Sequence, residues 1–463
     1  MDILALISCF ETLLRPATMR RMSVTIQAML AMTGRITMLS LSRWTEQGGS
    51  YRTLNRFFAE NLPWAQLLVT FFRAYLFNAE HEYILAGDET VVGKAGKKTF
   101  GTDRFFSGLK GKVIKGLSFF VFSLVDVNER KAVPVRVRQT IRSAEEQVAA
   151  AETRKKQQAA KKKKMGATKA KPAAHKQRKR GRPKGSRNQD KTKFTPSPEL
   201  KRIDEWLKEL LDQIRDFVAV KYLALDGYFG HHQAVLMARQ HDLQLISKLR
   251  KDSALYERPE EQVGRRGAPT KYGAKLTVGQ WPEKYLKRAV EEGRFETKYY
   301  QGIFVNKHFA EPINVVVIEK TEEESGKVAT AILFSSDLEL GWEKLIEYYR
   351  LRFQIEFNFR DAKQHFGLED FMQTTAKGVE NAANLSFLGV NVSAKLIQEG
   401  AGKWVGILDL KTHLRGIKYV QEIIKILQEK PELIKIKEGF QEVTEKLSQL
   451  GRIHQTKADT STS

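Results

Sequence analysis

The sequence predicts an α/β protein in which helices precede, flank and follow a sheet. Residues 1–80 carry apolar side chains at helical spacing, whereas short apolar runs bounded by turn residues begin at residue 82. Strand patterns then alternate with helical ones along most of the remaining chain. A chain of 463 residues, 42% of them hydrophobic, can bury a core and is long enough for several domains.

The charge of the chain indicates its partner. Lys and Arg number 78 against 54 Asp and Glu, a formal net charge of +24, and this excess favours a polyanion such as nucleic acid. Cys9 is the only cysteine, which excludes an intrachain disulfide framework and fits a reducing compartment. Residues 1–10 are apolar but lack a basic leader and are too short to span a bilayer. We therefore expect a cytoplasmic protein with no membrane partner.

The first unit, residues 1–80, is predicted to be helical and to bind DNA. Its apolar residues recur three and four positions apart, and strand-like runs are scarce. A helix beginning near residue 51 would carry Arg52 and Arg56. These two side chains would face either DNA or solvent, and the sequence leaves both interpretations open.

The core is predicted to begin at residues 81–145. Three strands are indicated at residues 83–88, 118–125 and 132–137, and a hairpin turn over residues 126–129 joins the last two. The core resumes at residues 198–240, where an amphipathic helix precedes an apolar strand that ends on Asp226. A β-rich insertion at residues 241–337 follows, and the last part of the core lies at 338–375, where one long helix runs over 341–365. The chain ends with a C-terminal helical region at 376–450 and a polar tail at 451–463.

A basic insertion, residues 146–197, separates the two parts of the core. Between residues 151 and 193 there are 18 basic residues against Glu152 and Asp190, so a net +16 of the +24 lies in this segment. Such a composition buries too little apolar surface to offset the entropy of ordering. The insertion is predicted to be disordered, or at most a lone helix.

Three acidic residues lie on these core elements. Asp88 and Asp226 end apolar strands, and Glu356 lies on the long helix. Cutting a phosphodiester bond without a covalent protein intermediate requires an activated hydroxyl, a stabilised phosphate and an assisted leaving oxygen. Two divalent cations held by carboxylates supply all three. Each acid also has an ordinary explanation, because strand-end Asp residues cap turns and helix Glu residues usually face solvent.

One face of the long helix carries further polar groups. Tyr349, Arg352, Glu356 and Lys363 fall within roughly a 60° sector at about 100° per residue. An aromatic hydroxyl, two cations and a carboxylate on one face suit DNA phosphate together with metal. A surface ladder of salt bridges would give the same pattern, and composition alone does not separate the two interpretations.

The pattern Tyr349-x2-Arg352-x3-Glu356-x6-Lys363 resembles the Tyr-Arg-Glu-Lys signature of one large family of DDE transposases of bacterial insertion sequences. Residues 86–90 resemble the first Asp motif of that family, residues 225–229 its second, and residues 333–338 the strand before its Glu helix. The acids are separated by 138 and 130 residues, and these intervals accommodate the basic insertion and the β-rich insertion. The resemblance covers about residues 80–380.

The resemblance implies an RNase H-like catalytic core, a mixed five-stranded sheet flanked by helices. It implies that Asp88, Asp226 and Glu356 hold two Mg²⁺ or Mn²⁺ ions in each active site. It also implies a bacterial or archaeal protein that acts near the nucleoid.

The same resemblance implies that Tyr349, Arg352 and Lys363 grip the transposon end near the scissile phosphate. In the family, a Trp of the β-rich insertion can stack on a flipped base. Trp281 is the candidate by region, and a buried core position is the alternative.

The basic insertion contains a second resemblance. Residues 180–185, Arg-Gly-Arg-Pro-Lys-Gly, resemble an AT-hook core, in which an extended chain lies in the minor groove of A·T-rich DNA. Arg180 and Arg182 would then enter the groove, with Lys184 beside them. The alternative is an unspecific basic linker held to phosphates by release of counterions.

Three functions remain in view. The first is a cut-and-paste transposase that acts on double-stranded DNA, at its terminal inverted repeats and at target DNA, as a homodimer because two ends must be joined. The second is a catalytically inactive or repurposed DNA-binding protein descended from a transposase. The third is an RNase H-like nuclease or junction resolvase, which should lack the Tyr-Arg-Glu-Lys helix and the β-rich insertion. The intact carboxylates and signature favour the first.

Overall fold

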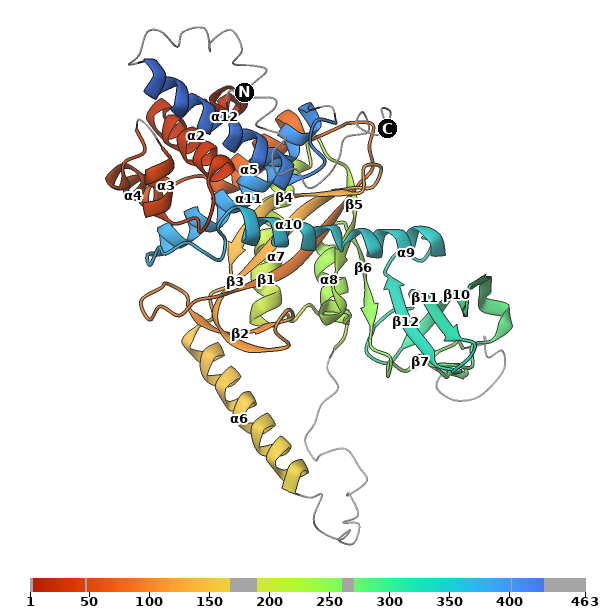
Figure 1. Ribbon diagram of the computed structural model, residues 1–463. Helices are drawn as coiled ribbons and strands as arrows, with labels where there is room; N and C mark the ends of the chain where they lie inside the picture. The colour runs from red at the N-terminus through yellow and green to blue at the C-terminus, as the bar shows by residue number, and fades with distance from the viewer. Residues whose placement is uncertain (1–2, 46–47, 167–189, 260–269, 401, 429–463) are drawn as a thin grey trace.

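A large mixed sheet forms the centre of the molecule in the computed structural model, which describes residues 3–45, 48–166, 190–259, 270–400 and 402–428 (Figure 1). The strands are β1 (Tyr83–Gly93), β2 (Asp103–Ser107), β3 (Lys112–Asp126), β4 (Lys131–Gln139), β5 (Val220–Leu225), β6 (Gln244–Leu249), β7 (Leu255–Tyr256), β8 (Lys275–Leu276), β9 (Leu286–Glu292), β10 (Phe295–Asn306), β11 (Ile313–Glu322) and β12 (Val328–Ser335). Their order is β2-β3-β1-β5-β6-β12-β11-β10-β7-β8, with β4 paired to β3 and β9 paired to β10. The predicted α/β class and mixed sheet are confirmed.

The strands that carry the predicted core lie side by side in the order β4-β3-β1-β5-β6. β3 runs antiparallel to β1, whereas β5 is parallel to β1 and β6 is parallel to β5. The sheet does not end with these five strands, because β12 pairs with β6 and extends it into the β-rich segment to twelve described strands. This pairing satisfies the N–H and C=O groups that β6 would otherwise expose as an edge strand.

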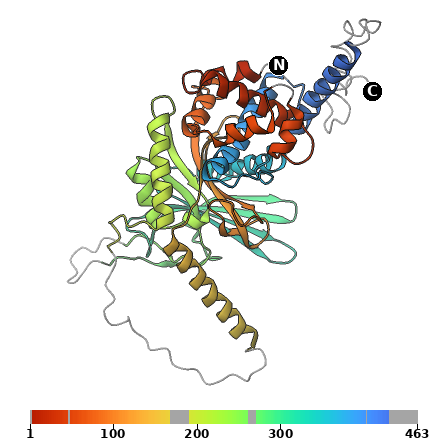
Figure 2. The same ribbon diagram turned by 90° about the vertical axis from the view of Figure 1, so that its left-hand side faces the viewer.

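Helices cover both faces of the sheet, as the two views at right angles show (Figures 1 and 2). Leu223 of β5 and Leu245 of β6 point into a hydrophobic core shared with α7 (Pro198–Ile214) and α8 (His232–Gln240). Their neighbours Ala224 and Ile246 point into the opposite core, which is shared with α9 (Trp342–Leu351), α10 (Gln354–His365) and α11 (Ala376–Glu399). The alternation follows from the two-residue period of a strand.

The N-terminal unit is helical, as predicted. It comprises α1 (Ile3–Leu6), a 3₁₀ turn (Ser8–Phe10), α2 (Pro16–Ala31), α3 (Met38–Trp44), α4 (Tyr51–Ala59) and α5 (Trp64–Tyr75). It packs on the same side of the sheet as α11, where the Trp64 indole donates a hydrogen bond to Asn381 at 2.6 Å. The C-terminal helix α12 (Ile407–Gln428) packs against α2 and α11. Among the described residues, no helix combines the length and the apolar character needed to cross a membrane.

The first part of the basic insertion is helical, which was the stated alternative to disorder. Helix α6 (Ala144–Gly166) projects away from the body (Figure 1). Its start is fixed by a capping box, because the Ser143 hydroxyl accepts from the Glu146 N–H and the Glu146 carboxylate accepts from the Ser143 N–H. Arg202 of α7 also pairs with Glu146 at 2.9 Å. These contacts explain why the start of the insertion is helical, a choice that composition alone leaves open.

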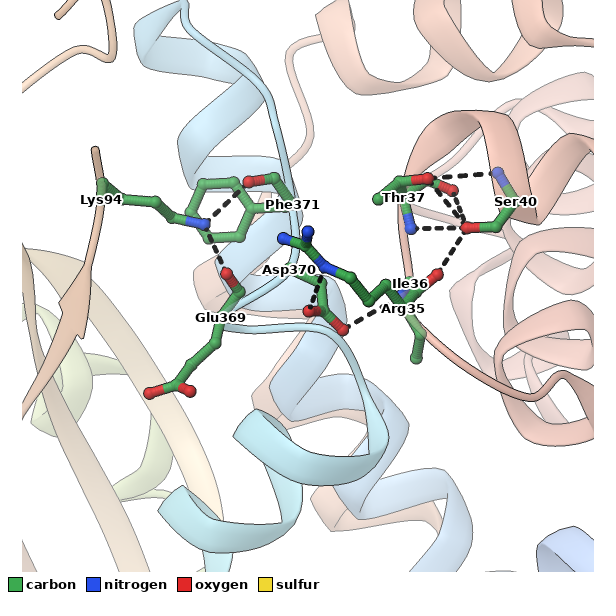
Figure 3. Close-up of polar contacts among 8 residues, drawn as sticks. All are labelled: Arg35, Ile36, Thr37, Ser40, Lys94, Glu369, Asp370 and Phe371. Carbon is green, nitrogen blue, oxygen red and sulfur yellow. Dashed lines mark hydrogen bonds and ion pairs between the residues drawn. The ribbon is translucent and has the colours of Figure 1, made fainter. Parts of the chain in front are cut away.

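The segment after α10 joins the N-terminal unit to the core (Figure 3). Asp370 accepts hydrogen bonds from the Ile36 N–H at 3.0 Å and from Arg35 Nε at 3.3 Å. On its other side, the ammonium of Lys94, just after β1, donates to the carbonyls of Glu369 and Phe371 at 2.9 and 2.7 Å. Burial lowers the pKa of Lys94 to about 8. Three parts of the chain are thereby tied together beside α10.

Candidate active site

Asp88 lies on β1 with its side chain on the face that α9 and α10 cover. Ile84 and Ala86 point into the core on that face, and Asp88 follows them at the same two-residue spacing. Gly87 lies between. A Cβ at Gly87 would come within 2.9 Å of the Leu225 side chain and 3.0 Å of the Phe120 ring, so a larger residue beside Asp88 would require these two side chains to shift.

Asp226 follows the last residue of β5 and lies opposite Asp88. In the parallel pair of β1 and β5, Ala86 is in register with Ala224 and Gly87 with Leu225, so the next positions are the two acids. The Asp226 carboxylate caps the short 3₁₀ turn η3 (Gly227–Phe229) by accepting from the Tyr228 N–H at 3.1 Å. Asp226 therefore does cap a turn, as strand-end Asp residues commonly do, and its carboxylate still lies beside Asp88.

Glu356 lies in the first turn of α10, after an interruption that the periodicity does not predict. The expected single helix over residues 341–365 is two helices, α9 and α10, divided at Arg352 and Phe353. At this point three-residue hydrogen bonds, from the N–H of Ile355 to Arg352 and of Glu356 to Phe353, replace the four-residue pattern. Both dividing residues keep right-handed helical angles, so apolar periodicity continues across the tightened turn.

Arg352 is the group that brings the acids together. Its guanidinium, only 9% exposed, pairs with Asp88 at 2.5 Å and approaches Glu356 at 3.9 Å. Its Nε is buried without a hydrogen-bond partner among the described residues. Asp88 on β1 and Glu356 on α10 thus share one buried cation, whose charge also acts on Asp226 after β5.

The acids of this site have raised pKa values. Burial is the largest cause for Asp88, Asp226 and Glu356, and the negative charge of Asp88 further raises the pKa of Asp226 and Glu356. Arg352 opposes the shift in all three. Carboxylates that are buried near one another favour an additional cation, because a cation relieves their repulsion. Oxygen donors of this kind suit Mg²⁺ or Mn²⁺.

The described residues do not form a closed cage for a metal ion. No group of three His, Cys, Asp or Glu side chains within the described ranges lies close enough together to hold one. Arg352, rather than a further acid, is the near neighbour of Asp88. The chemistry of the donor set fits a divalent cation, and Arg352 occupies part of the space between the donors.

The other two residues of the helix signature face inward. The Tyr349 ring packs under the Arg352 guanidinium, 5.6 Å from its centroid, and burial raises the pKa of its hydroxyl. The Lys363 ammonium donates to the carbonyl of Val91 at 3.1 Å, and burial lowers its pKa. The structure therefore places all four signature residues toward β1 and its neighbours, whereas a solvent-facing salt-bridge ladder would point away.

The remaining candidates lie elsewhere. Trp281 is 9% exposed, packs with Tyr300 and Phe304, and donates its indole N–H to Glu319 at 3.1 Å, so it occupies the core position that was the alternative to base stacking. Arg180, Arg182 and Lys184 lie outside the described residues. On α4, Arg52 and Arg56 are both exposed.

Sequence reasoning missed Lys248. The run at residues 244–248 was assigned to the β-rich insertion, but β6 pairs in parallel with β5 and belongs beside the acidic strands. A lysine two residues after a buried isoleucine in a central strand was the available signal, because strand periodicity puts both on one face.

Comparison with known proteins gives one family. A family model described as a DDE superfamily endonuclease matches residues 9–299. The matched segment contains Asp88 and Asp226 and ends before Glu356. No curated protein matches the chain.

Proposed function

Because the chain belongs to the DDE superfamily of endonucleases, we propose that it is a transposase that cuts DNA at the ends of an insertion sequence and transfers the strands to target DNA. The family match covers well over half of the chain and implies a DNA substrate. The net charge of +24 supports the same partner.

The observation that carries the proposal is that Asp226 lies beside Asp88 on the neighbouring strand, while Asp88 and Glu356 both contact the Arg352 guanidinium. The first two occupy matched positions on adjacent parallel strands, and the third comes from the helix packed over them. This arrangement supports an RNase H-like core, in which β4-β3-β1-β5-β6 is the catalytic sheet. The three acids would hold Mg²⁺ or Mn²⁺, two ions per site. When bound, such ions polarise the phosphate and lower the pKa of a bound hydroxyl.

The side chains around the acids would bind and orient the DNA. The fork of donors on the Arg352 guanidinium matches a phosphate as well as a carboxylate. A phosphate entering the site would take over donors that Asp88 now holds, which would release that carboxylate for a cation. Tyr349 would position the guanidinium, and Lys363 would add a second positive charge near the end of β1.

The helical N-terminal unit and the basic insertion would supply the rest of the DNA contact. Arg52 and Arg56 present two cations on the exposed side of α4. The AT-hook-like Arg180, Arg182 and Lys184 would bind the minor groove. These roles follow from charge and resemblance and are part of the proposal.

The second candidate is a DNA-binding protein that no longer cuts. It would keep the charge and the fold but not the chemistry, so cleavage separates the two. The decisive assay uses duplexes that carry the inverted repeats flanking the gene, with cleavage and binding both recorded at fixed salt.

We expect the wild type to cut at the repeat boundary only when Mg²⁺ or Mn²⁺ is added. Asp88→Asn, Asp226→Asn and Glu356→Gln should bind the duplex but cut at least about 100-fold more slowly, because each removes a carboxylate that would hold the divalent cations. Asp212→Asn, on the exposed side of α7 across the sheet, is the matched control and should cut normally. A wild type that binds the repeats and never cuts would establish the second candidate.

A further inference from the structure

Lys248 completes a row of polar residues across three adjacent strands. Ala224 of β5 is in register with Ile246 of β6, so the next positions on that face are Asp226 and Lys248. Since Asp226 also lies opposite Asp88, the row runs Asp88, Asp226, Lys248 across β1, β5 and β6. Neighbouring strands are about 4.8 Å apart, so the lysine is an immediate neighbour of the acid.

The three side chains share one face of the sheet. Ile246 points into the core on the side of α9 and α10, whereas Leu245 and Leu249 point into the opposite core. Lys248 therefore lies on the side of α9 and α10. On its other flank β12 puts Leu333 in register with Lys248, and Leu333 belongs to the same core. The row ends there in apolar side chains.

The backbone of Lys248 is held firmly against Asp226. The Ser247 hydroxyl donates to the Asp226 carbonyl at 2.7 Å. The turn after Asp226 lies directly over β6, because a side chain at Gly230 would come within 2.2 Å of the Lys248 carbonyl. A lysine fixed at its backbone next to a catalytic acid is well placed for substrate, since less ordering remains for binding to do.

The ammonium of Lys248 has no protein partner in the described part of the chain. Nearby cations differ: Arg352 pairs with Asp88, and Lys221 pairs with Asp337 at 2.8 Å. Lys248 is half-buried, and no described residue forms an ion pair or a side-chain hydrogen bond with it. A half-buried ammonium that pairs with no carboxylate of the described residues favours an anionic ligand.

We propose that Lys248 binds a phosphate of the DNA strand being cut, at or next to the scissile position, on the side of Asp226 away from Asp88. This inference rests on the proposed function, because it takes the acidic row as the cleavage site. Arg352 and Lys248 would then hold the strand from the two ends of the row. Lys248 would be a substrate-binding residue, with no part in proton transfer.

The first test compares Lys248→Ala and Lys248→Arg with the wild type. We expect the alanine variant to cut roughly 10- to 100-fold more slowly and to reduce the slope of log affinity against log salt by about 1, the loss of one phosphate contact. Lys248→Arg should restore the slope. Lys208→Ala, an exposed lysine of α7 across the sheet, should leave the cleavage rate unchanged. Circular dichroism and thermal melting show whether each variant is folded.

The second test finds the phosphate. Duplexes with a neutral methylphosphonate at each position around the cut are bound to wild type and to Lys248→Ala. At one position at or next to the cut, the neutral linkage should weaken binding by wild type several-fold but leave binding by the variant unchanged. The inference would be overturned if the neutral linkage weakened binding by the variant as much as binding by wild type at every position.

The outcomes also separate this inference from the proposed function. A wild type that does not cut speaks against the function, and the salt slope and methylphosphonate arms still decide whether Lys248 contacts a phosphate. A wild type that cuts, beside a Lys248→Ala variant that cuts and binds equally well, overturns the role of Lys248 alone. A wild type that fails to bind DNA overturns both.

Discussion

At the scale of single residues, the ionised carboxylates of the candidate site lower the stability of the folded protein. Asp88, Asp226 and Glu356 all have pKa values above their ordinary ranges, chiefly because the partly buried Asp88 and Asp226 and the more exposed Glu356 are each partly removed from water, and Arg352 compensates only in part. Sites that bind cations or phosphate commonly carry such a cost, which neutral substitutions relieve. The stability of the free protein can therefore be used to test the electrostatics without any substrate.

Asp226→Asn should stabilise the folded chain at neutral pH. Burial, followed by the charge of Asp88, raises the pKa of Asp226 above its ordinary 3.8. Between the ordinary and the raised value the folded chain keeps a proton that the unfolded chain has lost, so stability falls as pH rises through that range. At about pH 7 the wild type has lost all of the stability that depends on the Asp226 proton, whereas the variant has no such proton to lose. An asparagine also preserves the cap on the Tyr228 N–H.

The measurement is urea denaturation with a chelator present. We expect the variant to be more stable by about 1 kcal/mol at pH 7, with the difference shrinking as pH falls towards about 4. Asp212→Asn on the exposed side of α7 should show no such pH dependence. A variant less stable than wild type at pH 7 would mean that the Asp226 carboxylate is held by favourable contacts.

The residues that sequence could predict are those that its one-dimensional pattern marks. Asp226 follows an apolar strand, Asp88 follows an apolar run inside β1, which continues to Gly93 instead of ending at Asp88 as predicted, and Glu356 lies within a helix signature, so the sequence could propose all three. Lys248 was not, because its place depends on which strand pairs with β5. The contact of Lys363 with the Val91 carbonyl could not be predicted either. Helical periodicity shows which residues share a face, but not what that face packs against.

At the scale of elements, the least predictable feature is the division between α9 and α10. Helical periodicity continues through Arg352, so nothing in the pattern marks the tightened turn. The tightened turn lies at Arg352, the residue that pairs with Asp88. Helix α6 was difficult for another reason, because its start depends on Ser143 and on Arg202, 59 residues away from one another in the chain.

The segment after α10 is the element that joins the N-terminal unit to the site, and Asp370 is its central contact. Asp370→Ala removes the acceptor for the Ile36 N–H and the partner of Arg35. We expect a loss of about 1–3 kcal/mol in the free energy of unfolding, because an amide N–H that is partly buried is left without its acceptor. Asp370→Asn keeps an acceptor oxygen and should lose less than half as much.

Urea denaturation gives the energies, and hydrogen exchange gives the location. The Ile36 amide should exchange faster in Asp370→Ala, while amides of β1 keep their protection. Equal stability of the alanine variant and the wild type would show that this contact does not hold the N-terminal unit in place.

At the scale of the whole molecule, one continuous sheet links the proposed catalytic strands to the β-rich segment. Because β6 pairs with β5 on one side and with β12 on the other, a displacement of the β-rich strands reaches Lys248 directly. The predicted domain boundary at residue 241 thus falls inside a single sheet. Composition could indicate strands on both sides of that boundary, but pairing between segments about 80 residues apart is set by tertiary structure.

The net charge of +24 makes a prediction about assembly. Two copies of so basic a chain repel each other, and DNA phosphates neutralise that repulsion when they bind. Joining two transposon ends requires two copies in one complex. We therefore expect a monomer in solution at low salt and a complex of two chains with two repeat-bearing duplexes once DNA is added.

Light scattering coupled to size-exclusion chromatography measures both masses. Mixing wild type with cleavage-deficient Glu356→Gln tests whether the two copies act together. Suppose that both ends must be held before either is cut. An equimolar mixture should then retain cleavage in proportion to its wild-type subunits. It should join pairs of ends only in complexes whose two subunits are both active, which is about a quarter of complexes for random pairing. A stable dimer without DNA, or a single chain on one duplex that cuts at full rate, would show that assembly does not depend on neutralisation by two DNA ends.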